Sequence, residues 1–172
     1  GITTGVSVAV GASHACAVTS TGGVKCWGLN TSGQLGDGTL TQRLSPVDVK
    51  TALNTALGGA SASAGGALAA GATHSCVIKG TGSTATLLCW GANASGQLGI
   101  ASTTTAQYAT ALTSATVTGT SWLAAGGSHT VAVVPSATLA PSQIASWGLN
   151  KNGELGDGST TNRTSPVLVA TL

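Results

Sequence analysis

The sequence predicts an all-β fold built from about three copies of one propeller-type blade. Near-copies of one ten-residue phrase, Trp-Gly-x-Asn-x-x-Gly-Gln/Glu-Leu-Gly, begin at Trp27, Trp90 and Trp147. A second phrase, Gly-x-x-His, precedes each of them and ends at His14, His74 and His129. The two anchors recur at intervals of 55 to 63 residues, a period typical of blades made of several short strands.

The strands of each unit follow from its apolar segments. A short apolar segment comes first, at residues 6–10, 68–70 and 122–125, and a β-branched segment starts at each histidine, at 14–19, 74–79 and 129–134. A third strand ends at each Trp-Gly, at 24–28, 87–91 and 144–148. A last short strand is expected at 46–49 and 166–169, where proline is tolerable at the start.

These strands divide the chain into three units. The predicted blades cover residues 1–50, 68–118 and 119–172, and an Ala/Gly/Ser-rich segment at 51–67 lies between the first two. Glycine and serine interrupt the alanines of this segment, which favours a loop over a helix.

The repeat resembles that of the regulator of chromosome condensation family, over about residues 6–169. The resemblance rests on Gly-x-x-His, then Trp-Gly-x-Asn-x-x-Gly-Gln-Leu-Gly-Asp-Gly-Thr, then Ser-Pro-Val. It implies blades of four-stranded antiparallel sheets, in that family usually a closed ring of seven. Three blades cannot close such a ring, so we expect part of a larger propeller or an assembly completed by other chains.

The second unit departs from this pattern in a correlated way. Ile100 and Ala101 replace the Asp-Gly found at 37–38 and 157–158, and Ala106 replaces the arginine found at Arg43 and Arg163. The acid and the arginine are present together or absent together, which predicts that they contact each other within a blade. We also expect this loop of the second unit to differ in shape.

Four cysteines fall into two pairs, Cys16 with Cys26 and Cys76 with Cys89. Each pair would lie across a hairpin, within reach of a disulfide, and the third unit replaces both partners together, by Val131 and Ser146. Free thiols or a metal site are the alternatives, but no C-x-x-C spacing occurs. Disulfides indicate an oxidising compartment, so we expect a secreted or cell-surface protein, in an extracellular branch of the family.

Composition excludes several classes of function. Only 6% of the residues are charged and the net charge is +2, with no basic stripe for nucleic acid. No apolar run reaches the roughly 18 residues of a membrane span. There is no starting Met and no leader, so a processed or excised chain is expected. The four acids are sparse and no Gly-x-Ser-x-Gly occurs, so we expect no enzyme, no catalytic residue, no metal and no cofactor.

The repeated anchors have a structural interpretation. We expect the three histidines to bond neighbouring backbone, one in each blade, instead of converging on a metal or catalytic site. We expect the three repeated tryptophans to pack between blades, although they could offer a sugar-stacking face. Trp122 lies outside the phrase and could cover an edge or belong to a binding patch.

The sequence therefore favours a non-enzymatic extracellular module that binds protein: further blades of a parent chain, other copies of itself, or a target. The alternatives are a structural subunit of an extracellular fibre or surface layer, and a lectin-like glycan binder. The expected contacts are loops that vary between units, at Leu40, Thr41, Gln42, Arg43, Ile100, Tyr108, Ser159 and Arg163.

Glycosylation is a further possibility that the sequence leaves open. Asn30, Asn93 and Asn162 fit the N-glycosylation triplet. Two of them lie inside the repeated phrase, where coincidence is a sufficient explanation. The Thr/Ser-rich stretches at 61–66 and 102–105 could carry O-linked sugar.

Overall fold

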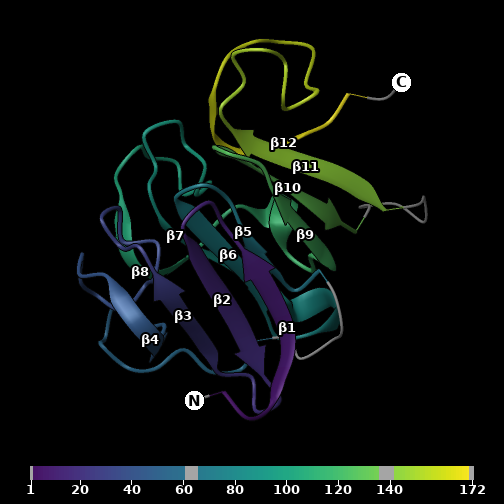
Figure 1. Ribbon diagram of the computed structural model, residues 1–172. Helices are drawn as coiled ribbons and strands as arrows, with labels where there is room; N and C mark the ends of the chain where they lie inside the picture. Colours follow the sequence, from purple (N-terminus) through teal and green to yellow (C-terminus); the bar gives the residue numbers. More distant parts are fainter. Residues whose placement is uncertain (1, 61–65, 136–141, 171–172) are drawn as a thin grey trace.

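The structure is a computed structural model that describes residues 2–60, 66–135 and 142–170. The strands of this part form three separate four-stranded sheets, in which neighbouring strands follow chain order (Figure 1). All the strand pairs are antiparallel. The all-β class and the four-stranded antiparallel blades are therefore confirmed. Most of the predicted O-glycosylation stretch at 61–66 lies outside the described residues.

The three sheets repeat one arrangement from an inner strand to an outer one. Blade 1 consists of β1 (Gly5–Val10), β2 (His14–Thr19), β3 (Val24–Gly28) and β4 (Arg43–Asp48). Blade 2 consists of β5 (Leu68–Ala70), β6 (His74–Lys79), β7 (Thr86–Gly91) and β8 (Ala106–Ala111). Blade 3 consists of β9 (Trp122–Ala125), β10 (His129–Val134), β11 (Gln143–Gly148) and β12 (Arg163–Leu168). Two short 3-10 turns, Gly82–Thr84 and Ala115–Val117, complete the described elements.

The outer strand of each blade corrects the sequence prediction. It begins three residues before the proline, at Arg43 and Arg163, and the second unit has one as well. Pro46 therefore lies inside β4. It is accommodated because β4 is the last strand of its sheet, where an amide hydrogen facing away from the sheet is not needed.

The loop before the outer strand also differs from the expectation for the second unit. In all three blades the outer strand pairs with the glycine that follows the tryptophan, 15 positions earlier: Gly28 with Arg43, Gly91 with Ala106, and Gly148 with Arg163. Ala101 adopts the positive φ of 58° where the other two loops have glycine. The backbone path is thus kept, because its ends are fixed by the sheet, and only the side-chain bonding changes.

The core is divided between the two blade junctions. One apolar cluster lies between blades 1 and 2 and includes Cys16, Leu35, Val77 and Trp90. A second lies between blades 2 and 3 and includes Cys76, Leu98, Ala132 and Trp147. The inner strands β1, β5 and β9 contact each other in turn, so the sheets spread outward from this side of the molecule (Figure 1). Each blade is stabilised mainly by burying its faces against its neighbours.

Candidate protein-interaction site

A chain of hydrogen bonds crosses the junction between blades 1 and 2. The Ser75 hydroxyl donates to the carbonyl oxygen of Gln34, at 3.3 Å, and therefore accepts from His14 Nε2, at 2.8 Å. The indole N–H of Trp90 donates to the same Gln34 oxygen, at 2.9 Å. Histidine and glutamine come from blade 1, and serine and tryptophan from blade 2, so the cluster ties the two blades together.

The junction between blades 2 and 3 repeats this cluster. His74 Nε2 lies 2.9 Å from Thr130 Oγ1, which donates to the carbonyl oxygen of Gln97 at 2.9 Å. Trp147 donates to that oxygen at 2.9 Å. Both junctions therefore share a hydroxyl on the residue directly after the histidine of the later blade. We refer to these four-residue groups as the junction clusters.

The bonding of the histidines corrects the expectation that they bond neighbouring backbone. Their partner is a side chain of the next blade, which only the docking of the sheets brings near. Burial lowers the pKa of both His14 and His74 to about 4, and each Nδ1 is buried with no hydrogen-bond partner. Both rings therefore stay neutral near pH 7. The described residues contain no group of three His, Cys, Asp or Glu side chains placed to hold a metal ion.

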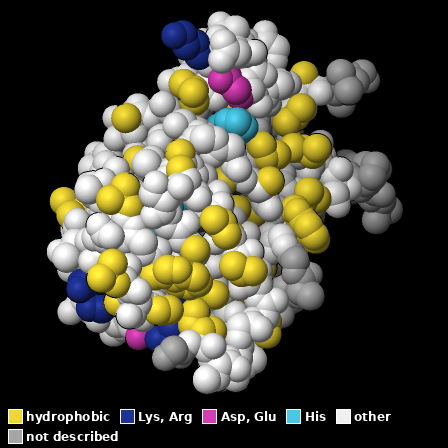
Figure 2. Space-filling view, viewed as in Figure 1, with side chains coloured by type: hydrophobic (Ala, Val, Ile, Leu, Met, Phe, Trp, Pro, Cys, Tyr) yellow, Lys and Arg dark blue, Asp and Glu magenta, His cyan; other side chains and the backbone are white. Residues whose placement is uncertain are grey.

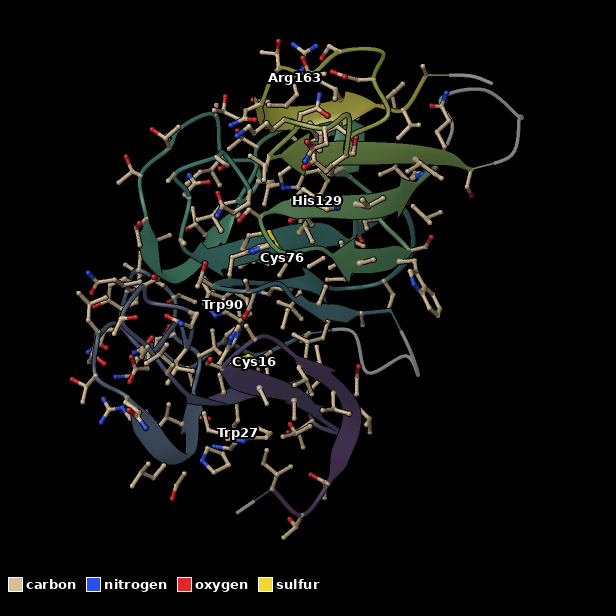
Figure 3. All side chains as sticks on the ribbon, turned by 45° about the horizontal axis from the view of Figure 1, so that its top comes forward. Cys16, Trp27, Cys76, Trp90, His129 and Arg163 are labelled. Atoms are coloured by element: carbon tan, nitrogen blue, oxygen red, sulfur yellow. A yellow bond between two sulfur atoms is a disulfide. The ribbon has the colours of Figure 1, made fainter. Side chains whose placement is uncertain are left out.

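The outer face of blade 1 differs from the faces buried at the junctions. Val8 is 67% exposed, whereas its counterparts Leu68 and Leu123 are 5% and 3% exposed. Ala15 stands where the junction clusters have their hydroxyl, and Trp27 is only half-buried. Apolar side chains gather over this face in Figure 2, and Figure 3 shows Trp27 on the far side of blade 1 from Trp90. An apolar sheet face is therefore open to solvent.

A second apolar face lies on the opposite side of blade 3. Trp122 pairs with Val133, and Val133 pairs with Ile144, so the three side chains form one row across the sheet. Trp122 is 52% exposed and Ile144 is 46% exposed. Trp122 thus contributes to an exposed apolar row, while its ring also lies against the backbone of Gly66, just before β5.

The structure contains both expected disulfides, Cys16–Cys26 and Cys76–Cys89. In each pair the two residues face each other directly across a hairpin. All four cysteines are fully buried because each disulfide is covered by the next blade (Figure 3). Val131 and Ser146 hold the matching positions on the outer face of blade 3.

Two loops contain the ion pair that the sequence predicts. Arg43 contacts Asp37 at 2.7 Å, and Arg163 contacts Asp157 at 2.7 Å. Hydrogen bonds from Ser159 and then Arg163 lower the pKa of Asp157 to about 2. Burial raises the pKa of Asp37, but hydrogen bonds from Thr39 and Arg43 outweigh this and leave it below its usual value.

The structure separates the predicted contact residues into free and engaged ones. Leu40, Thr41 and Gln42 are exposed. The others serve the fold: the two arginines form the ion pairs, Ser159 bonds to Asp157, Ile100 packs against a junction core, and the ring of Tyr108 lies against Gly38. The candidate contacts are thus reduced to residues 40–42 and the features around them.

A cavity of about 390 Å³ beside β4 was not predicted from the sequence. Asp37, Arg43, Asp48 and Lys50 are among its lining residues. Asp48 and Lys50 have no charged counterparts in the other units, where Ala111 and Thr113, or Leu168 and Ala170, hold the same positions. Charged residues present in only one unit were the sequence signal for this site. Only the fold shows that these residues lie together at one cavity.

Two of the three glycosylation triplets are unsuitable for a glycan in the folded chain. Asn30 and Asn93 are fully buried, and their side-chain amides donate to Asp37 and Thr39, and to Ser102 and Thr104, respectively. Asn162 is exposed.

Comparison with known proteins agrees with this geometry. The family pattern of the "Regulator of chromosome condensation (RCC1) repeat" matches residues 6–34 and 67–97. These two matched segments, in blades 1 and 2, are repeats of the RCC1 type. The structure of Prp20p from Saccharomyces cerevisiae superimposes with a TM-score of 0.72 and 22% identity, over 96% of this chain and 38% of that one. This likeness supports the propeller fold of the RCC1-type repeats.

Sequence relatives of the RCC1-type repeats are much longer than this chain. The "Probable E3 ubiquitin-protein ligase HERC4" of Rattus norvegicus is 33% identical over 95% of this chain, which spans 14% of that protein. The "Ultraviolet-B receptor UVR8" of Arabidopsis thaliana is 31% identical over 92% of this chain, which spans 32% of it. None of the helices in the described residues is long and apolar enough to cross a membrane.

Proposed function

We propose that this chain is a non-enzymatic, extracellular protein-binding module, and that copies of it associate through the two exposed blade faces. Contiguous exposed apolar surface is typical of protein–protein interfaces. The observation that carries the proposal is Val8, which is 67% exposed at a position where the other two blades are covered. The Trp122–Ile144 row of blade 3 supports it from the other side.

The two faces are of the kinds that already pack together inside the chain. At each junction the face of one blade that carries the disulfide position meets the tryptophan-bearing face of the next. The outer face of blade 3 is of the first kind, and that of blade 1 is of the second. Contact between copies is weaker than a junction, because Ala15 offers no hydroxyl to His129 of another copy and the Lys25–Asp48 pair, at 2.6 Å, lies on this face.

Light scattering after size exclusion tests the self-association. We expect the mass of the wild type to rise above that of one chain with increasing concentration. Val8→Glu should reduce the mass to that of one chain. Leu53→Glu, which changes an even more exposed apolar residue outside the sheets, should have no effect. A wild type that stays monomeric at all concentrations contradicts self-association.

Unlike faces joined head to tail produce either a closed ring or an open fibre. The same size-exclusion experiment therefore also tests the fibre alternative. A fibre should elute in the void volume of the column. The lectin alternative has less support, since two of the three repeated tryptophans, Trp90 and Trp147, are fully buried and cannot stack on a sugar. Trp27 is half-buried, and Trp122 lies outside the repeated phrase.

The extracellular part of the proposal is supported by the two buried disulfides, which form and persist in oxidising compartments. Mass spectrometry of the native protein, alkylated without reduction, tests it. We expect no alkylated cysteine, even when the unreduced protein is denatured. Four alkylated cysteines under these conditions would contradict the disulfides and the extracellular location.

A further inference from the structure

The charges of this chain are concentrated at one edge. The sequence has six basic and four acidic residues, and four of these ten line the cavity beside β4: Asp37, Arg43, Asp48 and Lys50. A fifth, Lys25, reaches it through its 2.6 Å ion pair with Asp48. Figure 2 shows charged side chains at the place of β4 on a face that is otherwise largely uncharged.

The repeat itself explains only two of these charges. The Asp37–Arg43 pair recurs as Asp157–Arg163 and belongs to the loop structure. Lys25, Asp48 and Lys50 recur in neither of the other units, which fold into the same sheet with apolar or small uncharged residues at these positions. The blade fold therefore does not require these three charges.

One positive charge in the cavity is not neutralised by the chain. The carboxylates of Asp37 and Asp48 are taken by Arg43 and Lys25, and no carboxylate among the described residues lies within 4.0 Å of the Lys50 amine. The Lys50 backbone is held at both ends, since its N–H donates to Gly36 and its carbonyl accepts from Ala109 of blade 2. The backbone of Lys50 is thus held in place, and its cationic side chain belongs to a concave site.

The surroundings favour a peptide as the occupant. Pro46 and Val47 add apolar surface to the cavity, while Leu44 and Leu40 are 90% and 50% exposed nearby in the chain. Leu40 begins the exposed loop 40–42, which lies in the chain between Thr39 and Arg43, two residues that line the cavity. A phosphate would favour several free cations, but Arg43 already spends its Nε and Nη2 groups on Asp37 and Thr39.

From these features we infer that the β4 cavity is a binding site for an acidic peptide segment of a partner protein, with Lys50 as the anchor for one Asp or Glu side chain. An aliphatic residue beside that acid contacts the apolar lining formed by Pro46 and Val47. The inference rests on the proposed protein-binding function and names a site for it at the β4 edge of blade 1, which borders the open face of that blade through the Lys25–Asp48 pair.

Selection from a phage-displayed random heptapeptide library on the immobilised full chain tests the site. We expect peptides that contain Asp or Glu next to an aliphatic residue to be enriched on the wild type. Lys50→Glu should abolish this enrichment, and Lys79→Glu, the same change in blade 2, should retain it. For a synthetic enriched peptide, Lys50→Gln should raise Kd by about tenfold, with a melting temperature unchanged from the wild type.

Two outcomes overturn the site. Acidic peptides that bind Lys50→Glu as well as the wild type would place recognition elsewhere. Enrichment of uncharged peptides, or of none, would also exclude the β4 cavity as an acidic-peptide site. The proposed self-association is read independently, from the mass of the wild type and of Val8→Glu, so either proposal can fail without the other.

Discussion

His14 of blade 1 and Ser75 of blade 2 are 61 positions apart in the sequence and 2.8 Å apart in the fold. The Ser75 hydroxyl donates its hydrogen bond to the carbonyl oxygen of Gln34, so His14 must donate to the serine oxygen from Nε2. The same relation joins His74 to Thr130. A neutral histidine is therefore built into each junction, and this has consequences for stability.

Acid should destabilise the fold through these two histidines. Burial lowers the pKa of His14 and of His74 to about 4, from 6.5. A lowered histidine pKa means that the unfolded chain binds the proton more tightly, so the stability is fully present above pH 6.5 and is lost as the pH falls from there toward 4. For His74 alone we expect a loss of about 2 kcal/mol between pH 7.5 and pH 5.

Urea denaturation at several pH values measures this loss. His74→Gln, which does not titrate, should weaken the pH dependence of stability below pH 6.5 without abolishing it, because His14 still titrates. If His74 were not responsible, the stability of His74→Gln would fall with pH as steeply as that of the wild type. His129→Gln is the control, because His129 lies on the outer side of blade 3, in no junction of the described chain.

Removing the junction hydroxyl should destabilise the fold without changing its shape. Thr130→Val keeps the side-chain volume but leaves His74 Nε2 with no acceptor in a buried site, which costs about 1–3 kcal/mol. Thermal denaturation gives the difference. Ala15→Ser, the matching position on the open face of blade 1, should change stability by less than about 0.5 kcal/mol. Equal effects at both positions would contradict the role assigned to the junction clusters.

The loop of blade 2 offers a stabilising substitution. Ala101 holds a φ of 58°, a left-handed conformation that costs an L-residue roughly 1–2 kcal/mol. Ala101→Gly should therefore stabilise the fold by about 1 kcal/mol. Gly158→Ala is the converse test, because Gly158 has a φ of 77° and open space around it. It should destabilise the fold by about 1 kcal/mol. A destabilising Ala101→Gly or a stabilising Gly158→Ala, measured by chemical denaturation, would refute this explanation.

Blade 3 provides a natural template for removing a disulfide. The double substitution Cys16→Val and Cys26→Ser copies Val131 and Ser146 into blade 1. We expect a loss of about 2–3 kcal/mol, since the disulfide closes a loop of sequence separation 10 in the unfolded chain. The folded wild type should also resist dithiothreitol, because both disulfides are fully buried. Fast reduction of the native protein, read by thiol labelling, would contradict this burial.

Much of the fold could be predicted because its signals are local. The β-branched residues at 129–134 indicate a strand whatever lies beside it, and His129–Val134 is that strand. The joint replacement of acid and arginine in the second unit indicates a short-range pair, which the other two loops contain. The sequence prediction started the outer strand at the proline, which usually begins or ends a strand. The sequence does not show that this strand is at the edge of its sheet, where a proline inside the strand is tolerated.

Contacts between blades had no such local signal. Nothing adjacent to His14 indicates Ser75 as its partner, and the charges of Lys25, Asp48 and Lys50 are scattered until β4 brings them to one cavity. The sequence by itself determined the repeat, the strands and the cysteine pairing, because each depends on residues within one unit. Only the tertiary structure decided which faces are buried, which tryptophans are covered and where charge gathers, because these follow from how the sheets pack on one another.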